Sequence, residues 1–388
     1  MTYALNDDQA SIRDSVQRLC ARFDKQYWHE ADTTGDFPHA FFDAMGAEGW
    51  LGVCIPPEYG GSGLGISEAA VMMRTVSEAG GGMSAASGIH VNVFGLHPVV
   101  VFGSDEQKKR MLPPIAAGQH KSCFGVTEPN TGLNTTQLKT RAVRHGDHYL
   151  VNGQKVWISN AQVANKILLL ARTTPLEEVE KPTHGLSLFY TDLDRSTVSI
   201  RAIDKMGRKC IDSNELFFEN FRIPVEDRIG EEGRGFQYIL HGMNPERILI
   251  ASEAVGLGML ALQTATQYAK DRNVFNRQIG KNQGIQHPLA RNWMDLEAAW
   301  LMTMSAARQY DAGQECGASA NAAKFLAAEA GYEACQTAVM THGGFGYAKE
   351  YHVERYLREI MIPRIAPISP QLILSYIAER VLGLPKSY

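Results

Sequence analysis

The sequence lacks any excess of basic residues, since 38 Lys and Arg stand against 42 Asp and Glu for a formal net charge of −4. Such a chain has no electrostatic footprint for nucleic acid or an anionic membrane. The six cysteines show no CxxC pair and no metal-type spacing, which predicts reduced thiols and no metal site. No apolar run reaches the length of a membrane span, and no basic or apolar leader opens the chain. We therefore expect a cytoplasmic protein without a nucleic-acid or membrane partner.

A fixed-period repeat and a low-complexity tract are also absent, and 388 residues are too many for one compact core. Apolar residues follow helical spacing over residues 1–120, alternate over 121–232, and return to long helical patterns over 233–388. These regions predict an α+β fold with an N-terminal helical domain, a middle antiparallel β-sandwich or barrel domain and a C-terminal four-helix-bundle domain. In the middle region, Asn152-Gly153 between two apolar runs predicts a hairpin with a type I′ turn.

Glu246 and Arg247 stand side by side at the start of a long apolar helical pattern. Asn244 is a favoured N-cap and Pro245 suits the first helical position, so we expect a helix to begin here. The helix dipole favours a carboxylate in the first turn by about 0.3–1 kcal/mol, which alone could account for Glu246. Arg247 could likewise be an ion-pair partner of Glu246 or Asp227. This motif by itself leaves a structural and a chemical role open.

Two strand ends in the middle region carry groups that a flat aromatic cofactor needs. Phe124-Gly-Val-Thr-Glu-Pro leads from one strand into a turn, and Trp157-Ile-Ser ends another. Such a cofactor binds to a backbone edge, short hydroxyls and a ring for packing. Either motif alone is better explained by edge-strand polar residues and a core tryptophan, whereas the two together favour a cofactor site.

The order of these motifs resembles that of the acyl-CoA dehydrogenases. The shared features are the Thr-Glu-Pro loop, the Trp-Ile-Ser strand, a Gly-rich boundary at 230–235, Arg272-Asn-Val-Phe275 and His342-Gly-Gly-Phe-Gly-Tyr347. Together they cover the chain from a Gly-rich loop near residue 55 to the last helix. The resemblance implies an FAD-dependent enzyme that converts an acyl-CoA thioester to a trans-2-enoyl-CoA. It also implies electron-transfer flavoprotein as the acceptor and a homo-oligomer, commonly a tetramer.

The same resemblance implies the binding residues. The cofactor residues on the flavin-ring side would be Phe124, Val126, Thr127, Gly132, Leu133, Trp157, Ile158 and Ser159. Those that meet the pyrophosphate and adenine of an FAD bound mainly by another subunit would be Arg272, Phe275, Gln283, Gly343 and Gly344. Glycines let the backbone approach a phosphate, although Gly343-Gly344 alone is better explained as a helix C-cap. Leu133, Asn244 and Arg247 would contact the acyl-CoA.

Two departures from the family pattern concern the chemistry. Many members have Ser-Asp where this chain has Leu133-Asn134, which removes a hydroxyl contact. The usual catalytic Glu precedes the last helix, where this chain has Pro367, and proline cannot take a proton. A smaller set, resembling the isovaleryl- and long-chain-specific enzymes, places the base at the position of Glu246. The resemblance therefore implies that a desolvated Glu246 abstracts the α-proton while hydride passes from Cβ to flavin N5.

Other functions on the same fold stay open at this stage. They are an acyl-CoA oxidase, an enoyl-CoA reductase, and a non-catalytic flavin- or acyl-CoA-binding protein, the last prompted by Pro367. No motif fixes the length or branching of the acyl chain. Small residues over 84–95 hint at room for a long or bulky acyl group.

Overall fold

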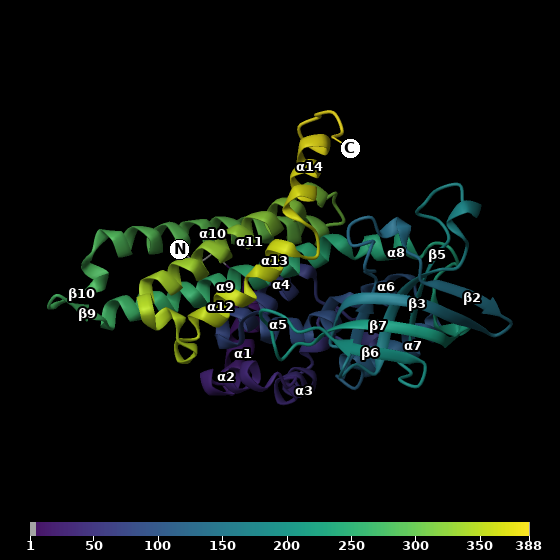
Figure 1. Ribbon diagram of the computed structural model, residues 1–388, viewed down its shortest axis with the longest axis horizontal. Coiled ribbons are helices and arrows are strands. Elements are labelled where there is room, and N and C mark those ends of the chain that lie inside the picture. The colour runs from purple at the N-terminus through teal and green to yellow at the C-terminus, as the bar shows by residue number, and fades with distance from the viewer. Residues whose placement is uncertain (1–4, 388) are drawn as a thin grey trace.

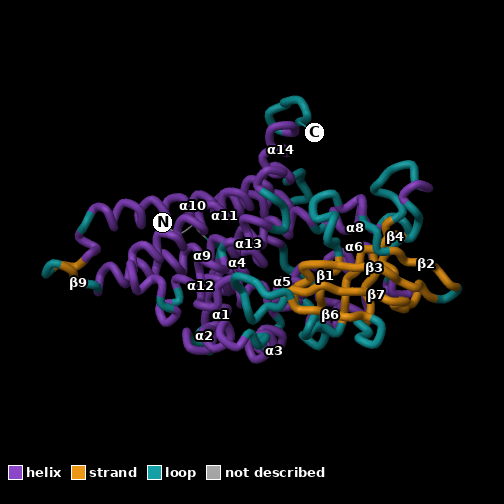
Figure 2. Tube along the Cα trace, in the orientation of Figure 1, coloured by secondary structure: helices purple, strands orange, loops and turns teal. Residues whose placement is uncertain are grey.

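The computed structural model describes residues 5–387 and confirms the predicted fold class. Helices from both ends of the chain form an elongated body, and the strands of the middle domain gather at one end of it (Figure 1). Figure 2 shows the same division, with the sheet beside the helices rather than between them. The protein thus has an N-terminal helical domain, a middle β-sheet domain and a C-terminal helical domain.

The N-terminal domain consists of short helices. They are α1 (Asp7–Cys20), α2 (Lys25–Thr34), α3 (His39–Ala47), α4 (Ile66–Val76), α5 (Gly82–His90), α6 (His97–Phe102) and α7 (Asp105–Ala116). Every residue of α5 is buried, because this helix lies between the rest of its domain and the C-terminal helices. Wide π-helical turns at Ser77–Gly81 and Val91–Gly95 flank α5.

The middle domain is built from one twisted sheet. Its strands are β1 (Ser122–Gly125), β2 (Arg141–His145), β3 (His148–Ser159), β4 (Lys166–Arg172), β5 (Leu186–Asp192), β6 (Val198–Ala202), β7 (Ser213–Pro224) and β8 (Arg228–Ile229). The order is β6-β7-β3-β2-β4-β5-β8, and β1 and β2 pair with β4 in parallel, unlike the antiparallel remainder. The rings of Tyr149 and Phe189 lie 5.0 Å apart although β2 and β4 separate their strands. The sheet therefore curls over its own core, as a sandwich or barrel does.

The expected hairpin at Asn152-Gly153 is wrong. β3 runs unbroken through both residues and pairs with β7 along its length, with a register shift between Val151 and Gly153. Gly153 has φ of +150°, and a Cβ there would lie 2.6 Å from the Thr140 hydroxyl. The dipeptide therefore marks a bulge with a close backbone approach. The turn between β2 and β3 lies at 146–147 instead.

The C-terminal domain has three long helices and several short ones. Its elements are α8 (Gly235–His241), α9 (Met243–Asp271), β9 (Asn273–Val274), β10 (Arg277–Gln278), α10 (Gln283–Asp311), α11 (Gly317–His342), α12 (Val353–Glu359), α13 (Met361–Ile365) and α14 (Pro370–Arg380). α4 of the N-terminal domain packs against α9 and α10, so the core is continuous across the two helical domains. Gly258 lets α9 approach α11 closely, because a Cβ there would lie 3.0 Å from the Cα of Gly331.

The expectation that no apolar run reaches a membrane span is also wrong. By length and composition, three helical stretches could cross a membrane: Ile66–Phe102, Gly235–Asp271 and Val353–Arg380. The protein buries 67% and 89% of the most apolar windows of the first two, but 17% of the third. Each stretch joins helices that the sequence suggested were separate, for example α4 to α6 through the π-helical turns.

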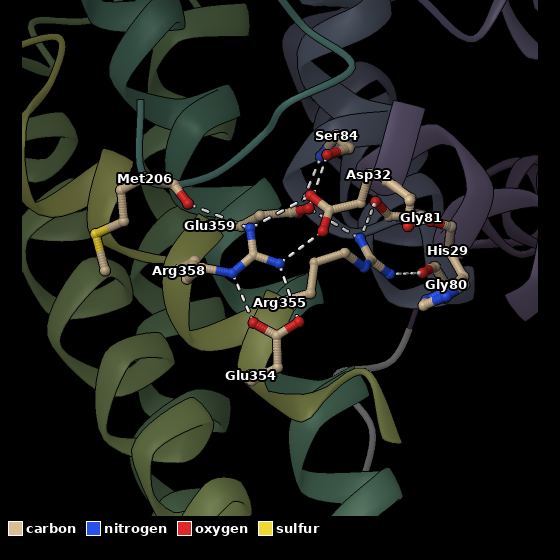
Figure 3. Close-up of polar contacts among 11 residues, drawn as sticks. His29, Asp32, Gly80, Gly81, Ser84, Met206, Glu354, Arg355, Arg358 and Glu359 are labelled. Atoms are coloured by element: carbon tan, nitrogen blue, oxygen red, sulfur yellow. Dashed lines mark hydrogen bonds and ion pairs between the residues drawn. The ribbon is translucent and has the colours of Figure 1, made fainter. Parts of the chain in front are cut away.

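Hydrogen bonds from a buried ion pair of α12 fasten this helix to the N-terminal domain (Figure 3). Arg355, 3% exposed, donates to Glu359 Oε1 at 2.9 Å and to the carbonyl oxygens of Gly80 and Gly81. Glu359, fully buried, accepts hydrogen bonds from the hydroxyl and backbone N–H of Ser84 at 2.7 and 3.1 Å. The start of α5 is therefore held by a charge on α12.

We expect Arg355→Met to destabilise the fold strongly, because it leaves Glu359 buried without its cation. Removing one partner of a buried pair costs about 3–5 kcal/mol. Arg13→Met is the matched control, since its partner Asp14 and Arg13 itself have side chains 51% and 40% exposed and such pairs contribute about 0–1 kcal/mol. Urea denaturation followed by circular dichroism measures both. Equal midpoints for the two variants would contradict this account.

Candidate active site

Glu246 lies in the first turn of α9, but the helix does not begin as expected. α9 starts at Met243, and only Gly242 separates it from α8, so Asn244 already lies inside the helix. The expectation that Asn244 is the N-cap is therefore wrong. Its side-chain oxygen instead accepts a hydrogen bond from Arg247 Nη1 at 2.9 Å.

A buried histidine joins Glu246 to a second carboxylate. Glu246 Oε2 lies 2.7 Å from His90 Nε2, and His90 Nδ1 lies 2.5 Å from Glu253 Oε1. Glu253 follows Glu246 by two helical turns, so both side chains project from α9 toward α5. The side chains of Glu246, His90 and Glu253 are 26%, 9% and 0% exposed. Glu246 is thus the one member that a ligand can reach.

The two carboxylates fix the charge of His90. Burial opposes protonation of the imidazole, but Glu246 and Glu253 outweigh it and raise the pKa of His90 well above its ordinary value. An imidazolium donates from both ring nitrogens, which matches an acceptor at each. His90 is not among the residues that the sequence predicts here. The only signal was the spacing of two Glu residues on one helix face.

On the other side of Glu246, Arg247 is partly buried and its Nε has no hydrogen-bond partner among residues 5–387. Burial lowers the pKa of Arg247, opposed in part by Glu246. Neither of the two ion pairs considered for Arg247 forms within the described chain, because Asp227 pairs with Arg110 at 2.7 Å instead. Arg247 is therefore a cation beside Glu246 with a donor to spare.

The segment that holds the usual base in the family lies on this same side of α9. Lys324 donates to the carbonyl oxygen of Ile368 at 2.7 Å. Burial and the nearby charge of Arg247 lower the pKa of Lys324 to about 8. The position of Pro367 thus adjoins two cations and supplies no acid of its own.

The two predicted strand ends of the middle domain do lie side by side. The backbone N–H of Val156 donates to Thr127 O at 2.9 Å, and Lys155 Nζ donates to Val126 O at 2.9 Å. Lys155, fully buried, also meets Glu128 Oε1 at 2.9 Å. Burial lowers the pKa of Lys155 to about 8 although Glu128 opposes the shift. Glu128 is therefore a brace for the loop and not a free acid.

The predicted ring-side residues present an apolar edge. Trp157 and Leu133 are each 60% exposed, although both are large and apolar. Ile158 is 2% exposed, so only its backbone can meet a ligand. The remaining members are half-buried or, for the glycine, exposed: Phe124, Val126, Thr127, Ser159 and Gly132.

The second predicted set is exposed and lies elsewhere. Its members are Arg272, Phe275, Gln283, Gly343 and Gly344. Phe275 is 95% exposed, and the β9–β10 hairpin that carries it lies at the opposite end of the molecule from β3 (Figure 1). Gly343 is the C-cap of α11 with φ of +60°, which agrees with the structural explanation for this pair. Within one chain, then, the two sets do not meet.

Comparison with known proteins defines the class. The models for the N-terminal, middle and C-terminal domains of acyl-CoA dehydrogenases match residues 6–119, 123–221 and 233–382. The acyl-CoA dehydrogenase FadE12 of Mycobacterium tuberculosis is 35% identical, over 99% of this chain and 98% of the relative. The caffeyl-CoA reductase–Etf complex subunit CarC of Acetobacterium woodii is 34% identical, over 86% and 87%. The structure of butyryl-CoA dehydrogenase from Megasphaera elsdenii has a TM-score of 0.92 and 27% identity, covering 98% of this chain and 100% of that one.

Fold, site and comparisons together define a flavoprotein oxidoreductase that acts on acyl-CoA thioesters. The chain belongs to the acyl-CoA dehydrogenase family, and its matches support FAD-dependent acyl-CoA dehydrogenation as its activity.

The Lys155–Glu128 pair generates a prediction about the Thr127 loop. We expect Lys155→Met to cost about 3–5 kcal/mol and to loosen this loop, because Glu128 would remain buried without a cation. Limited proteolysis should then cut near 126–140. Lys166→Met is the control, since its partner Asp192 has a side chain 80% exposed. Unchanged protease resistance in Lys155→Met would show that the pair does not hold the loop.

Proposed function

We propose that Glu246 is the catalytic base of the dehydrogenation. The supporting observation is that Glu246 is a partly exposed carboxylate where α9 meets α5, held by His90 and adjacent to Arg247. Other acids near these helices are taken up by structural contacts, as Glu253 and Glu359 are fully buried. Burial of the acyl group beside Glu246 would exclude water and favour proton transfer to it.

The chemistry balances in two bond cleavages. The α-proton passes to a carboxylate oxygen of Glu246, the Cα–H electron pair becomes the new Cα=Cβ bond, and the β-hydrogen leaves as hydride. FAD supplies the acceptor for that hydride. Arg247 would lie beside the thioester as a cation, and its buried Nε has no hydrogen-bond partner among residues 5–387. Asn244 would hold the Arg247 side chain in place through their hydrogen bond.

The described residues fit a flavin at the edge formed by β1 and β3. Trp157 and Leu133 offer apolar surface to a ring, Thr127 and Ser159 offer hydroxyls, and the backbone of 126–128 is fixed by Lys155. The residues assigned to the adenine side are exposed to solvent, and the hairpin that carries Phe275 lies at the end of the molecule away from β3. We infer that a second copy supplies them, so the enzyme is a homo-oligomer, and a tetramer satisfies the family pattern.

We further propose electron-transfer flavoprotein as the electron acceptor and the cytoplasm as the location. The likeness to a reductase subunit named for its Etf complex supports that acceptor, and it also makes enoyl-CoA reduction the second candidate. Anaerobic addition of acyl-CoA, with and without the carrier, separates the two. Rapid peroxide formation in air would indicate an oxidase instead.

Glu246→Gln should remove substrate-induced bleaching of the flavin while leaving the protein yellow. The amide cannot accept the α-proton, so we expect a loss of about 10²–10⁴-fold in the rate, as for other general bases. Stopped-flow absorbance under anaerobic conditions measures it. Glu219→Gln, at an exposed strand position, should bleach at the wild-type rate. A loss below tenfold in Glu246→Gln would remove this residue from the role.

A shared cofactor site predicts complementation between two inactive variants. Trp157→Ala damages the ring side and Arg272→Ala the adenine side, and each alone should reduce the flavin content of purified protein. Co-expression with different affinity tags yields mixed pairs in which one site has both defects and the other has none. We therefore expect doubly tagged protein to recover bound flavin. Recovery no greater than that of the single variants would mean that one chain builds the whole site.

A further inference from the structure

The imidazole of His90 is the only side chain that directly pairs with Glu253 in the described part of the chain. Glu253 is fully buried, its Oε1 meets His90, and its Oε2 has no hydrogen-bond partner among those residues. A buried ion pair is a poor source of stability, because the desolvation of both charges offsets their attraction. A gain in stability therefore does not account for the arrangement.

His90 differs from two other shielded histidines of the protein, His97 and His352. Burial lowers the pKa of His97 and of His352 to about 4, so these rings are neutral near pH 7. His97 stacks on the ring of Phe94 at 4.8 Å, and its Nε2 meets the hydroxyl of Tyr310 at 3.3 Å. His90 alone of the three is held as a cation, and it is the one that contacts the partly exposed carboxylate of Glu246.

We propose that His90, fixed by Glu253, is a positioning residue for Glu246. Its Nε2–H holds Oε2 of the carboxylate, which leaves Oε1 to receive the α-proton of the substrate. The second N–H, given to Glu253, sets the plane of the ring and so the direction of the first. This assignment rests on the proposed role of Glu246 as base.

The charges explain why an imidazolium suits this place. An acyl-CoA that covers Glu246 strips water from the carboxylate, and a cation 2.7 Å away replaces part of that hydration. With His90 protonated, the three groups carry a net charge of −1 before proton transfer and zero after it. The His90–Glu253 pair stays intact throughout, so no buried charge is left alone after the proton has moved.

Other charged groups around the three residues keep a constant charge. Arg208, in the segment between β6 and β7, acts on Glu253 and donates to the hydroxyl of Ser87 at 2.8 Å. Arg247 acts on Glu246 from α9. Ser77, directly after α4, also contacts Glu253: its hydroxyl donates a hydrogen bond to the backbone oxygen of Glu253. Because guanidinium groups do not deprotonate in proteins, Arg208 and Arg247 keep their charge over the whole pH range of the test.

The test is the pH profile of anaerobic flavin bleaching at saturating acyl-CoA between about pH 6 and 9. His90→Gln keeps a neutral N–H donor but loses the charge and the exact ring geometry. We expect its rate to fall by about 10–100-fold. Its acid limb should move to higher pH by at least about one unit, because Glu246 then loses the cation that lies 2.7 Å from its carboxylate. Acyl-CoA affinity should change little.

Glu253→Gln is the second variant, and we expect its rate to fall at high pH rather than at low pH. The pKa of His90 is raised by two carboxylates, so His90 stays charged as pH rises. Loss of Glu253 removes one of these two carboxylates and lowers that pKa, so the ring gives up its proton at a lower pH than in the wild type. Glu253→Gln should therefore match the wild type at low pH and approach His90→Gln at high pH. His97→Gln is the matched control and should keep the wild-type profile.

Unfolding in urea gives a readout that needs no flavin. If the two residues contact each other in solution, the midpoint shifts of His90→Gln and Glu253→Gln should be non-additive in the double variant. Additive shifts would overturn the proposed contact. If His90→Gln fails to fold, Glu253→Gln carries the same test with the imidazole in place.

The possible outcomes distinguish the positioning role of His90 from the role of Glu246 as base. Suppose that Glu246→Gln is inactive but both His90→Gln and Glu253→Gln keep the wild-type rate and pH profile. This result would overturn the positioning role of His90 and leave Glu246 as the base. Glu246→Gln active would overturn the base itself. Loss of rate in His90→Gln at every pH, with no movement of the acid limb and a wild-type profile in Glu253→Gln, would mean a packing role only.

Discussion

The docking of α5 between the C-terminal helices is the constraint on which the site depends. Its first turn is fixed by Ser84, which donates to the buried carboxylate of Glu359 on α12. Its last residue, His90, is fixed by Glu253 on α9. A nine-residue helix pinned at both ends by buried charges cannot slide along its neighbours without leaving one of them unpaired. The position of Glu246 relative to α5 is therefore set by contacts that lie away from the reacting atoms.

Similar pairs fix other parts of the molecule. Lys155 and Glu128 hold the Thr127 loop against β3, and Arg358 joins α12 to Asp32 of α2 at 2.6 Å. None of these pairs need increase stability relative to an apolar core of the same shape. These pairs fix the relative orientation of the segments they join, because a hydrogen-bonded charge accepts few alternative partners. Loops and helix ends, which apolar packing holds loosely, are where that property is most useful.

The sequence predicted the order of the three domains because helical and strand periodicities are local features. It failed at Asn152-Gly153, because a glycine with positive φ suits a hairpin turn and a bulge equally. Pairing with β7, more than 50 residues away in the sequence, favours the bulge, because β7 pairs with both halves of β3. Glu246 was predicted from a motif shared with known enzymes. His90 was not, since its contact with Glu246 exists only once α5 has docked on α9, and no spacing within 82–90 records that event.

The charges near the Pro367 segment explain why the base can be on α9. Arg247 and Lys324 lie together there, and among residues 5–387 no carboxylate forms an ion pair with either of them. In relatives with a Glu before the last helix, a negative charge enters this region from the loop. Here the carboxylate that acts on Arg247, after Tyr376, is Glu246, one residue away on the same helix. A carboxylate on the helix therefore keeps an anion beside the same cations while the loop carries none. It also reaches the substrate from a rigid element, whose direction the contact with His90 can set.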